Sequence, residues 1–183
     1  MSELIPRLNA EELPADVAAF LRPRVERLGY LGEFFRCTAH QPKALLSFLH
    51  FTEDLKHALP DNLTEVVALT VAALMNNAYE RVQHERLSLK LGFGENWVRT
   101  VLSAKAEKNG VLSEAESDVQ KLTLAVVARR GHDTRPELDK VIQQIGHQQA
   151  VAVLMLIGRY MTHALIVNTL ALAPPVPSPL EGK

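Results

Sequence analysis

The sequence predicts an all-α fold, a bundle of about six to eight helices. Apolar residues recur at helical spacing in several long stretches, some of which begin at a proline or a capping residue and end at a glycine. No alternation of apolar and polar residues, which would be typical of a β-strand, continues for more than a few residues. Because 47% of the 183 residues are hydrophobic, we expect a single domain with one sizeable core.

The first two predicted helices each contain a proline. Residues 13–29 are expected to form a short helix or a pair of turns, interrupted at Pro23, because proline lacks the backbone N–H that a helix interior needs. Residues 41–59 are expected to form a longer helix whose first turn holds Pro42, a position that tolerates proline. The stretch that follows has few polar positions, so we expect it to be central in the bundle.

A break is predicted within this central stretch. One helix over residues 62–91 would be about 45 Å long, which is unusual for a domain of this size. Asn76 and Asn77 interrupt it, and asparagine is a poor helix former but a good N-cap. We therefore expect a second helix to begin at or near Asn77. The first helix is expected to start with a capping box between Asn62 and Glu65.

Further helices are expected in the second half of the chain. They cover residues 94–107, 112–131, 135–146 and 150–172. The second of them opens with Ser113 and Glu116 in capping-box spacing. The last is the most apolar stretch of the chain, but its uncharged run ends within about nine residues, well short of what a bilayer requires. We therefore expect it to be buried, inside the protein or against a second copy of the chain.

The composition excludes several classes of partner. The chain holds 20 Lys and Arg against 21 Asp and Glu, a formal net charge of -1, so it lacks the basic surface of a protein that binds nucleic acid or anionic membranes. Its single cysteine, Cys37, cannot form an internal disulfide and is expected to be a small core residue. The N-terminal segment is acidic and contains prolines, unlike a secretion signal, so we expect a cytoplasmic protein.

A polar stripe on the helix after the break is the strongest functional signal. Asn77, Glu80 and His84 follow one another at spacings that place them on one face of that helix. A carboxylate beside an imidazole can exchange protons near neutral pH. If the stripe faces a cavity, burial is expected to raise the pKa of Glu80 unless a protonated His84 lies beside it. A solvated helix face with the same spacing is the alternative interpretation.

The stripe belongs to a longer pattern that resembles the carboxymuconolactone decarboxylase family, which includes the alkylhydroperoxidase D-like proteins. In that family a glutamate is followed, eleven residues on, by Cys-x-x-Cys-x-x-x-His and later by a glycine. Glu65 occupies the glutamate position, and Asn77 and Glu80 occupy the positions of the two cysteines. His84 and Gly92 match the histidine and the glycine.

The resemblance implies a division of the chain into three parts. Residues 1–27 would be an N-terminal helical extension, residues 28–172 the carboxymuconolactone decarboxylase-like domain, and residues 173–183 a proline-rich flexible tail. It also implies a helical bundle of the alkylhydroperoxidase D-like type and a homo-oligomer, a trimer or a hexamer. A small-molecule substrate and no cofactor are expected.

The resemblance also implies an activity. Peroxidase members depend on their two cysteines as a dithiol, and Asn77 and Glu80 cannot act as one. What remains is cofactor-free proton transfer or decarboxylation on a small cyclic organic acid or lactone, with Glu80 and His84 as the catalytic pair and Glu65 orienting His84. An alkylhydroperoxidase-like antioxidant and a noncatalytic, oligomeric small-molecule-binding protein are the two alternatives.

Further residues are expected to contact the substrate. Asn77 would hold a carbonyl or a water through its amide, while Tyr79 and Tyr160 would pack beside the substrate. A carboxylate on the substrate would need an arginine, and Arg36 or Arg159 is the candidate anchor.

No metal site is expected in this chain. Glu80 and His84 would supply only two ligands, and no second histidine shows paired spacing near them.

Overall fold

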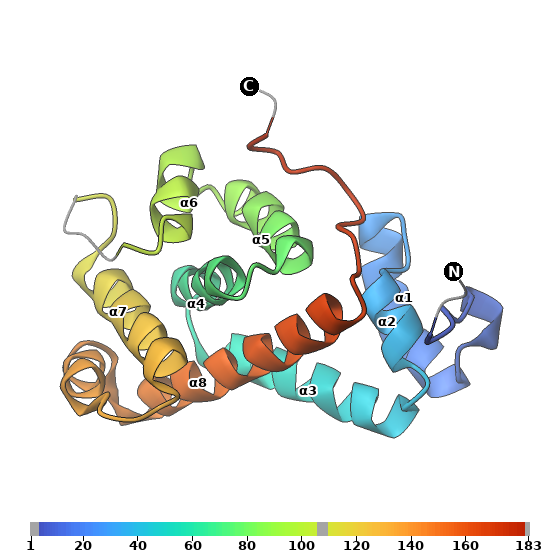
Figure 1. The fold of residues 1–183 in the computed structure, drawn as a ribbon, viewed down its shortest axis with the longest axis horizontal. Coiled ribbons are helices and arrows are strands. Elements are labelled where there is room, and N and C mark those ends of the chain that lie inside the picture. Colours follow the sequence, from blue (N-terminus) through green and yellow to red (C-terminus); the bar gives the residue numbers. More distant parts are fainter. Residues whose placement is uncertain (1–3, 106–109, 182–183) are drawn as a thin grey trace.

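The computed structural model describes residues 4–105 and 110–181, and within them it contains eight α-helices and no β-strand (Figure 1). The helices are α1 (Ala15–Leu28), α2 (Glu33–Thr38), α3 (Pro42–Ala58), α4 (Asp61–Leu74), α5 (Ala78–Lys90), α6 (Glu95–Leu102), α7 (Glu114–Arg129) and α8 (Arg135–Thr169). A short 3-10 turn, Ala10–Glu12, precedes α1. The predicted all-α fold is confirmed.

Helix α4 is the central element of the bundle. Every residue on it from Leu63 to Ala72 is buried, and α5, α7 and α8 pack around it (Figure 1). The main core that results includes Val98, Leu122 and Leu156 from the surrounding helices. Because all faces of α4 are covered, any polar side chain on it must find its partners inside the protein.

A second apolar cluster joins the N-terminal helices to the end of α8. It includes Val17 of α1, Phe34 of α2, Leu49 of α3 and Val167 of α8. Cys37 lies in the same cluster and is 5% exposed, which confirms the prediction of a small core residue.

Two N-terminal elements differ from their predictions. Helix α1 continues through Pro23, whose side chain lies on the exposed face, so the expected interruption is wrong. Helix α2 was not predicted, because six residues are too few to show helical periodicity in the sequence.

The predicted helix caps have mixed outcomes. Asn77 is the N-cap of α5, and its side-chain oxygen accepts a hydrogen bond from the Glu80 backbone N–H at 3.1 Å. The capping box that opens α7 is also confirmed. The box between Asn62 and Glu65 is not formed: Asn62 donates to Glu116 at 2.9 Å, and Glu65 turns into the core.

Helix α8 is the long apolar helix expected at the C-terminal end. Gly146, with φ 78° and ψ 169°, separates its first part from its second, at the point where two helices were predicted. Among the described residues, only α8 is long and apolar enough to cross a membrane. Its most apolar window has a mean hydropathy of 1.8, but 56% of that window is buried inside the protein, as in a core helix.

The exposed side of α8 carries an apolar stripe. Val151, Met155 and Leu165 are 54%, 45% and 57% exposed, and Gly158 and Thr162 lie between them on the same helix face. Small and apolar residues at alternating spacings of three and four form the kind of seam that packs against another helix. We propose that a second copy of the chain covers this stripe.

Light scattering at micromolar concentration is therefore expected to give a multiple of the 20.3 kDa chain mass. Leu165→Glu should shift the protein toward the monomer, because it places a charge within the apolar contact. A matched change at an exposed polar position in the part of α8 before Gly146, Gln144→Glu, should leave the mass unchanged. A wild-type protein that is monomeric under these conditions would contradict the proposal.

The segment after α8 crosses over α5 and α6. The Ser178 hydroxyl donates to Glu85 Oε2 at 2.6 Å, and the Leu180 carbonyl accepts from Arg99 at 3.1 Å. Leu180 itself is 8% exposed and belongs to the main core. These contacts hold Pro179 at the wall of the cavity described next.

Candidate active site

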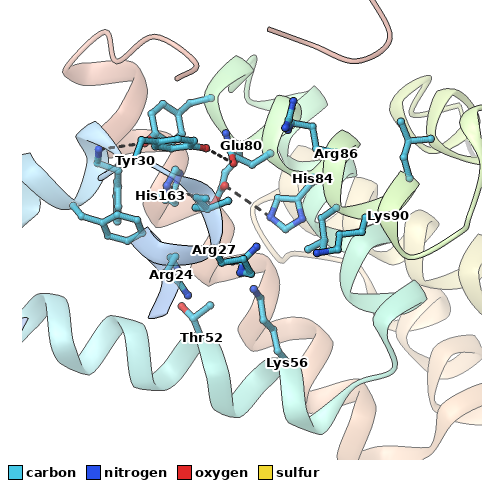
Figure 2. A pocket seen from close by; sticks show the side chains of 18 of the residues that line it. Arg24, Arg27, Tyr30, Thr52, Lys56, Glu80, His84, Arg86, Lys90 and His163 are labelled. Carbon is cyan, nitrogen blue, oxygen red and sulfur yellow. Dashed lines mark hydrogen bonds and ion pairs between the residues drawn. The ribbon is translucent and has the colours of Figure 1, made fainter. Parts of the chain in front are cut away.

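A cavity of about 500 Å³ lies between the N-terminal helices, α3, α5 and α8 (Figure 2). Among the described residues, six cationic side chains and one carboxylate line it. The cations are Arg24, Arg27, Lys56, Arg86, Lys90 and Arg159, and the carboxylate is Glu80. Because the whole chain carries a formal charge of only -1, this concentration of positive charge favours an anionic ligand.

Glu80 lies at the inner end of the cavity, between two histidines (Figure 2). Its Oε1 accepts a hydrogen bond from Arg159 Nη1 at 2.8 Å and lies 3.5 Å from His163 Nε2. Its Oε2 lies 3.8 Å from His84 Nε2. Glu80 is only 7% exposed, so the interpretation of a solvated helix face is wrong.

The surroundings of Glu80 favour its ionised form. Burial by itself would raise its pKa, but the positive charges of His163, Arg159 and His84 and the hydrogen bond from Arg159 outweigh burial and hold the pKa well below its ordinary value. The pKa is thus lowered rather than raised: the sequence allowed for a charged His84 beside Glu80, but not for Arg159 and His163. Burial lowers the pKa of His163 to about 4, against the opposing effect of Glu80, so Arg159 is the counter-charge of Glu80 at neutral pH.

Glu65 holds the other side of His84. His84 Nδ1 lies 2.8 Å and 3.0 Å from the two carboxylate oxygens of Glu65, and the Ser88 hydroxyl donates to the same carboxylate at 2.9 Å. A carboxylate accepts hydrogen bonds, so Nδ1 is the donor and Nε2 is left to exchange a proton in the cavity. The expected orienting contact between Glu65 and His84 is present.

Arg159 and its neighbours are fixed by ring contacts. The Arg159 guanidinium lies 4.3 Å from the centre of the Tyr160 ring and 5.0 Å from that of Phe48, and its Nε donates to Thr52 at 3.0 Å. His163 stacks on Phe34, with ring centres 4.1 Å apart. These contacts hold the groups around Glu80 in a single arrangement.

Besides Arg159, the residues expected to contact the substrate lie in different places. Tyr79 lines the cavity. Asn77 and Tyr160 are buried and are not lining residues; the Asn77 amide lies 3.4 Å from His163 Nδ1 and so orients that ring. Arg36 lies outside the cavity and donates to the Leu8 carbonyl at 2.9 Å, which corrects its assignment as a carboxylate anchor.

The centre of the cavity does not have the character of a cation site. Arg159 already neutralises Glu80, and its positive charge opposes a metal ion beside the two histidines. Within the part of the chain that the structure describes, no group of three or more His, Cys, Asp and Glu side chains is arranged to hold a metal ion.

Comparison with known proteins identifies similar folds but no similar sequences. No protein-family model matches the sequence, and no curated protein matches it. Among solved structures, an uncharacterised peroxidase-related protein from Ralstonia eutropha with an alkylhydroperoxidase D core aligns with a TM-score of 0.81 at 14% identity, over 92% of this chain and 90% of that one. The debrominase Bmp8 aligns with a TM-score of 0.81 at 13% identity, over 96% and 94%. The fold is alkylhydroperoxidase D-like.

The sequence alone did not identify the two cavity residues that α8 contributes to this alkylhydroperoxidase D-like bundle. Its patterns single out Arg159 only as a candidate anchor for the substrate and do not single out His163. Both lie on one face of α8, four residues apart, and meet Glu80 of α5. The signal that was available is two polar residues at helical spacing inside an otherwise apolar stretch.

The free energy of unfolding is expected to fall as the pH drops from about 6.5 to about 4. The pKa of His163 is about 4 in the folded protein against an ordinary 6.5, so the unfolded chain binds more protons in this window. The lowered pKa of His163 accounts for about 3 kcal/mol of the free energy of unfolding. This stability is fully present above about pH 6.5 and is lost as the pH falls to about 4. The lowered pKa of Glu80 acts in the same direction at lower pH.

Urea unfolding at a series of pH values measures this dependence, and His163→Gln should reduce its slope. His147→Gln, which changes an exposed histidine on the same helix, is the matched control and should keep the wild-type slope. Equal slopes in the wild type and in His163→Gln would contradict the assignment.

Proposed function

We propose that this cavity binds a small cyclic organic acid or lactone and catalyses cofactor-free proton transfer or decarboxylation on it. The observation that carries the proposal is the ionised carboxylate of Glu80 3.8 Å from the imidazole of His84, both buried in a cavity lined mainly by cations. The volume of about 500 Å³ suits a small ring with one or two substituents.

His84 is the proton carrier in this proposal. Glu65 and Ser88 hold Nδ1, so that Nε2 can take a proton from the substrate or return one to it. Loss of carbon dioxide from a ring acid with a carbonyl next to the carboxylated carbon moves the electron pair of the broken C–C bond onto the carbonyl oxygen as an enolate, which the surrounding cations stabilise before His84 reprotonates its carbon. Because its pKa is held well below the ordinary value, Glu80 stays ionised, and its role is that of an electrostatic partner to the imidazolium of His84.

Arg159 is a poor first contact for the substrate, because it already bonds to Glu80. Cations without an ion pair in the described part of the chain, Arg27, Arg86 and Lys90, are better placed to attract a carboxylate at the cavity entrance. Figure 2 shows these three side chains around the cavity.

One solved neighbour supports a ring-shaped ligand. A variant of the debrominase Bmp8, solved in complex with 2,3,4-tribromopyrrole, aligns with this chain with a TM-score of 0.79 at 14% identity. The likeness shows the fold alone, so the ring ligand of that protein supports the proposal only through the shared fold.

The alternative of a dithiol peroxidase has little support from the chain itself. Peroxide reduction of that kind needs two cysteines that cycle between thiol and disulfide, and this chain has only Cys37, which is buried in the second apolar cluster.

A binding and turnover screen tests the proposal. Small cyclic carboxylic acids, the corresponding lactones and alkyl peroxides would be screened by thermal shift and then by release of carbon dioxide or consumption of peroxide. Ring acids are expected to raise the unfolding midpoint, while peroxide turnover with a dithiol reductant should be negligible. Binding of ring acids without turnover would favour the noncatalytic alternative, and robust peroxide turnover lost in Cys37→Ser would establish the peroxidase.

A further inference from the structure

Lys56 is a cavity residue that the proposed proton transfer does not use. It lies on α3 one helical turn after Thr52, and both side chains point from α3 into the cavity (Figure 2). Its neighbours Arg24 and Arg159 are paired with Glu53 at 2.7 Å and with Glu80 at 2.8 Å. Lys56 has no such counter-charge among the described residues, although its side chain is more than half buried.

The electrostatic surroundings of Lys56 lower the pKa of its amine. Burial lowers its pKa first of all, the positive charges of Arg159 and Arg24 lower it further, and Glu53 opposes them only in part. A lysine that is desolvated and placed beside other cations is activated as a nucleophile, because a larger fraction of it carries a free electron pair.

We propose that Lys56 is a nucleophilic amine that condenses with the carbonyl carbon of a small 3-oxo acid bound in this cavity. The inference rests on the proposed function and names its substrate class, an anion with a ketone next to the carbon that bears the carboxylate. The cationic wall attracts the carboxylate, and Lys56 lies in the same cavity as Glu80 and His84.

The chemistry of the step balances without a further reagent. The Nζ electron pair forms a bond to the carbonyl carbon, the carbonyl oxygen takes up two protons and leaves as water, and a protonated C=N bond remains. When the carboxylate leaves as carbon dioxide, the electron pair of the broken C–C bond moves into the C=N system and gives an enamine. His84 protonates the enamine carbon, and water then releases the ketone and restores the amine.

Reductive trapping tests the proposal on the full-length chain. The protein is incubated with 2-oxocyclopentanecarboxylate and sodium cyanoborohydride, and the adduct is measured by intact mass and located by peptide mapping. One adduct is expected, at Lys56, with a mass increase equal to that of the oxo acid, or of its decarboxylated ketone, less one oxygen atom. Labelling at Lys56 should exceed labelling at Lys43, an exposed lysine on the same helix, on the order of tenfold at neutral pH.

Two variants sharpen the result. Lys56→Arg keeps the charge but removes the nucleophile, so the adduct should disappear, while Lys43→Arg should trap as the wild type does. No adduct in the wild type, or labelling spread evenly over surface lysines, would overturn the inference, and peptide mapping of the wild type decides this even if Lys56→Arg folds poorly.

The failure of this inference and that of the proposed function are distinguishable. An adduct at Lys56 without release of carbon dioxide would support the nucleophile and refute the decarboxylation. Release of carbon dioxide that continues in Lys56→Arg would refute the nucleophile and leave the proposed function in place.

Discussion

Glu80→Gln is expected to lower the free energy of unfolding by about 3 kcal/mol. The change keeps the volume and one hydrogen-bond acceptor, but it leaves Arg159, which is 8% exposed, without its negative partner. Removing one member of a buried ion pair costs more than the pair contributes, because the remaining charge stays in a medium of low polarity. Chemical denaturation of the variant measures the loss.

A double-mutant cycle assigns this loss to the pair. Arg159→Met should also be destabilising, since it leaves Glu80 buried and removes the contacts with Thr52 and Tyr160. The double variant Glu80→Gln/Arg159→Met should be more stable than the sum of the single effects predicts, by roughly 2 kcal/mol.

A surface ion pair gives the matched control. Glu181 pairs with Arg81 at 2.8 Å, and its side chain is 68% exposed, so solvent screens the interaction. Glu181→Gln is therefore expected to change the stability by less than about 0.5 kcal/mol. An equally small effect of Glu80→Gln would show that the carboxylate is solvated, and the description of the cavity centre would be wrong.

Substitutions of Glu65 and Ser88, which hold Nδ1 of His84, are expected to lower turnover by different amounts. Glu65→Gln should reduce turnover of a ring acid on the order of 100-fold or more, because an amide can donate to Nδ1 and move the ring proton to Nε2. Ser88→Ala removes one of the hydrogen bonds to Glu65 and should cost roughly tenfold or less.

The readout is kcat and KM for the same substrate in each variant. A role in proton transfer should appear mainly in kcat, since neither residue is among those that line the cavity. Equal losses in the two variants, or losses confined to KM, would contradict the orienting role.

The local signals in the sequence were sufficient for most helices and for one half of the site. Asn77 as an N-cap and the spacing of Glu80 and His84 follow from helix geometry, which depends on residues a few positions apart. The contact between Glu65 and His84 needed the family resemblance, because two helices must pack before those side chains meet.

The other half of the site depends on tertiary packing that no local pattern encodes. Arg159 and His163 reach Glu80 only because α8 crosses the bundle beside α5, about 80 residues away in sequence. The same packing reversed the expected pKa of Glu80, since burial alone would have raised it. Arg24 and Lys56 complete the cationic wall from helices whose sequences show only ordinary surface charges.

Deuterium incorporation into the product reports directly on proton transfer by the cavity around Glu80 and His84. Wild-type protein and His84→Gln would be incubated in deuterium oxide with the ring acids that bind, and the products would be followed by nuclear magnetic resonance. Protein-dependent deuterium incorporation is predicted at the carbon that loses its carboxylate, at a rate that falls on the order of 100-fold or more in His84→Gln. Incorporation at the rate of buffer alone, or at equal rates in the two proteins, would contradict a catalytic cavity centred on Glu80 and His84.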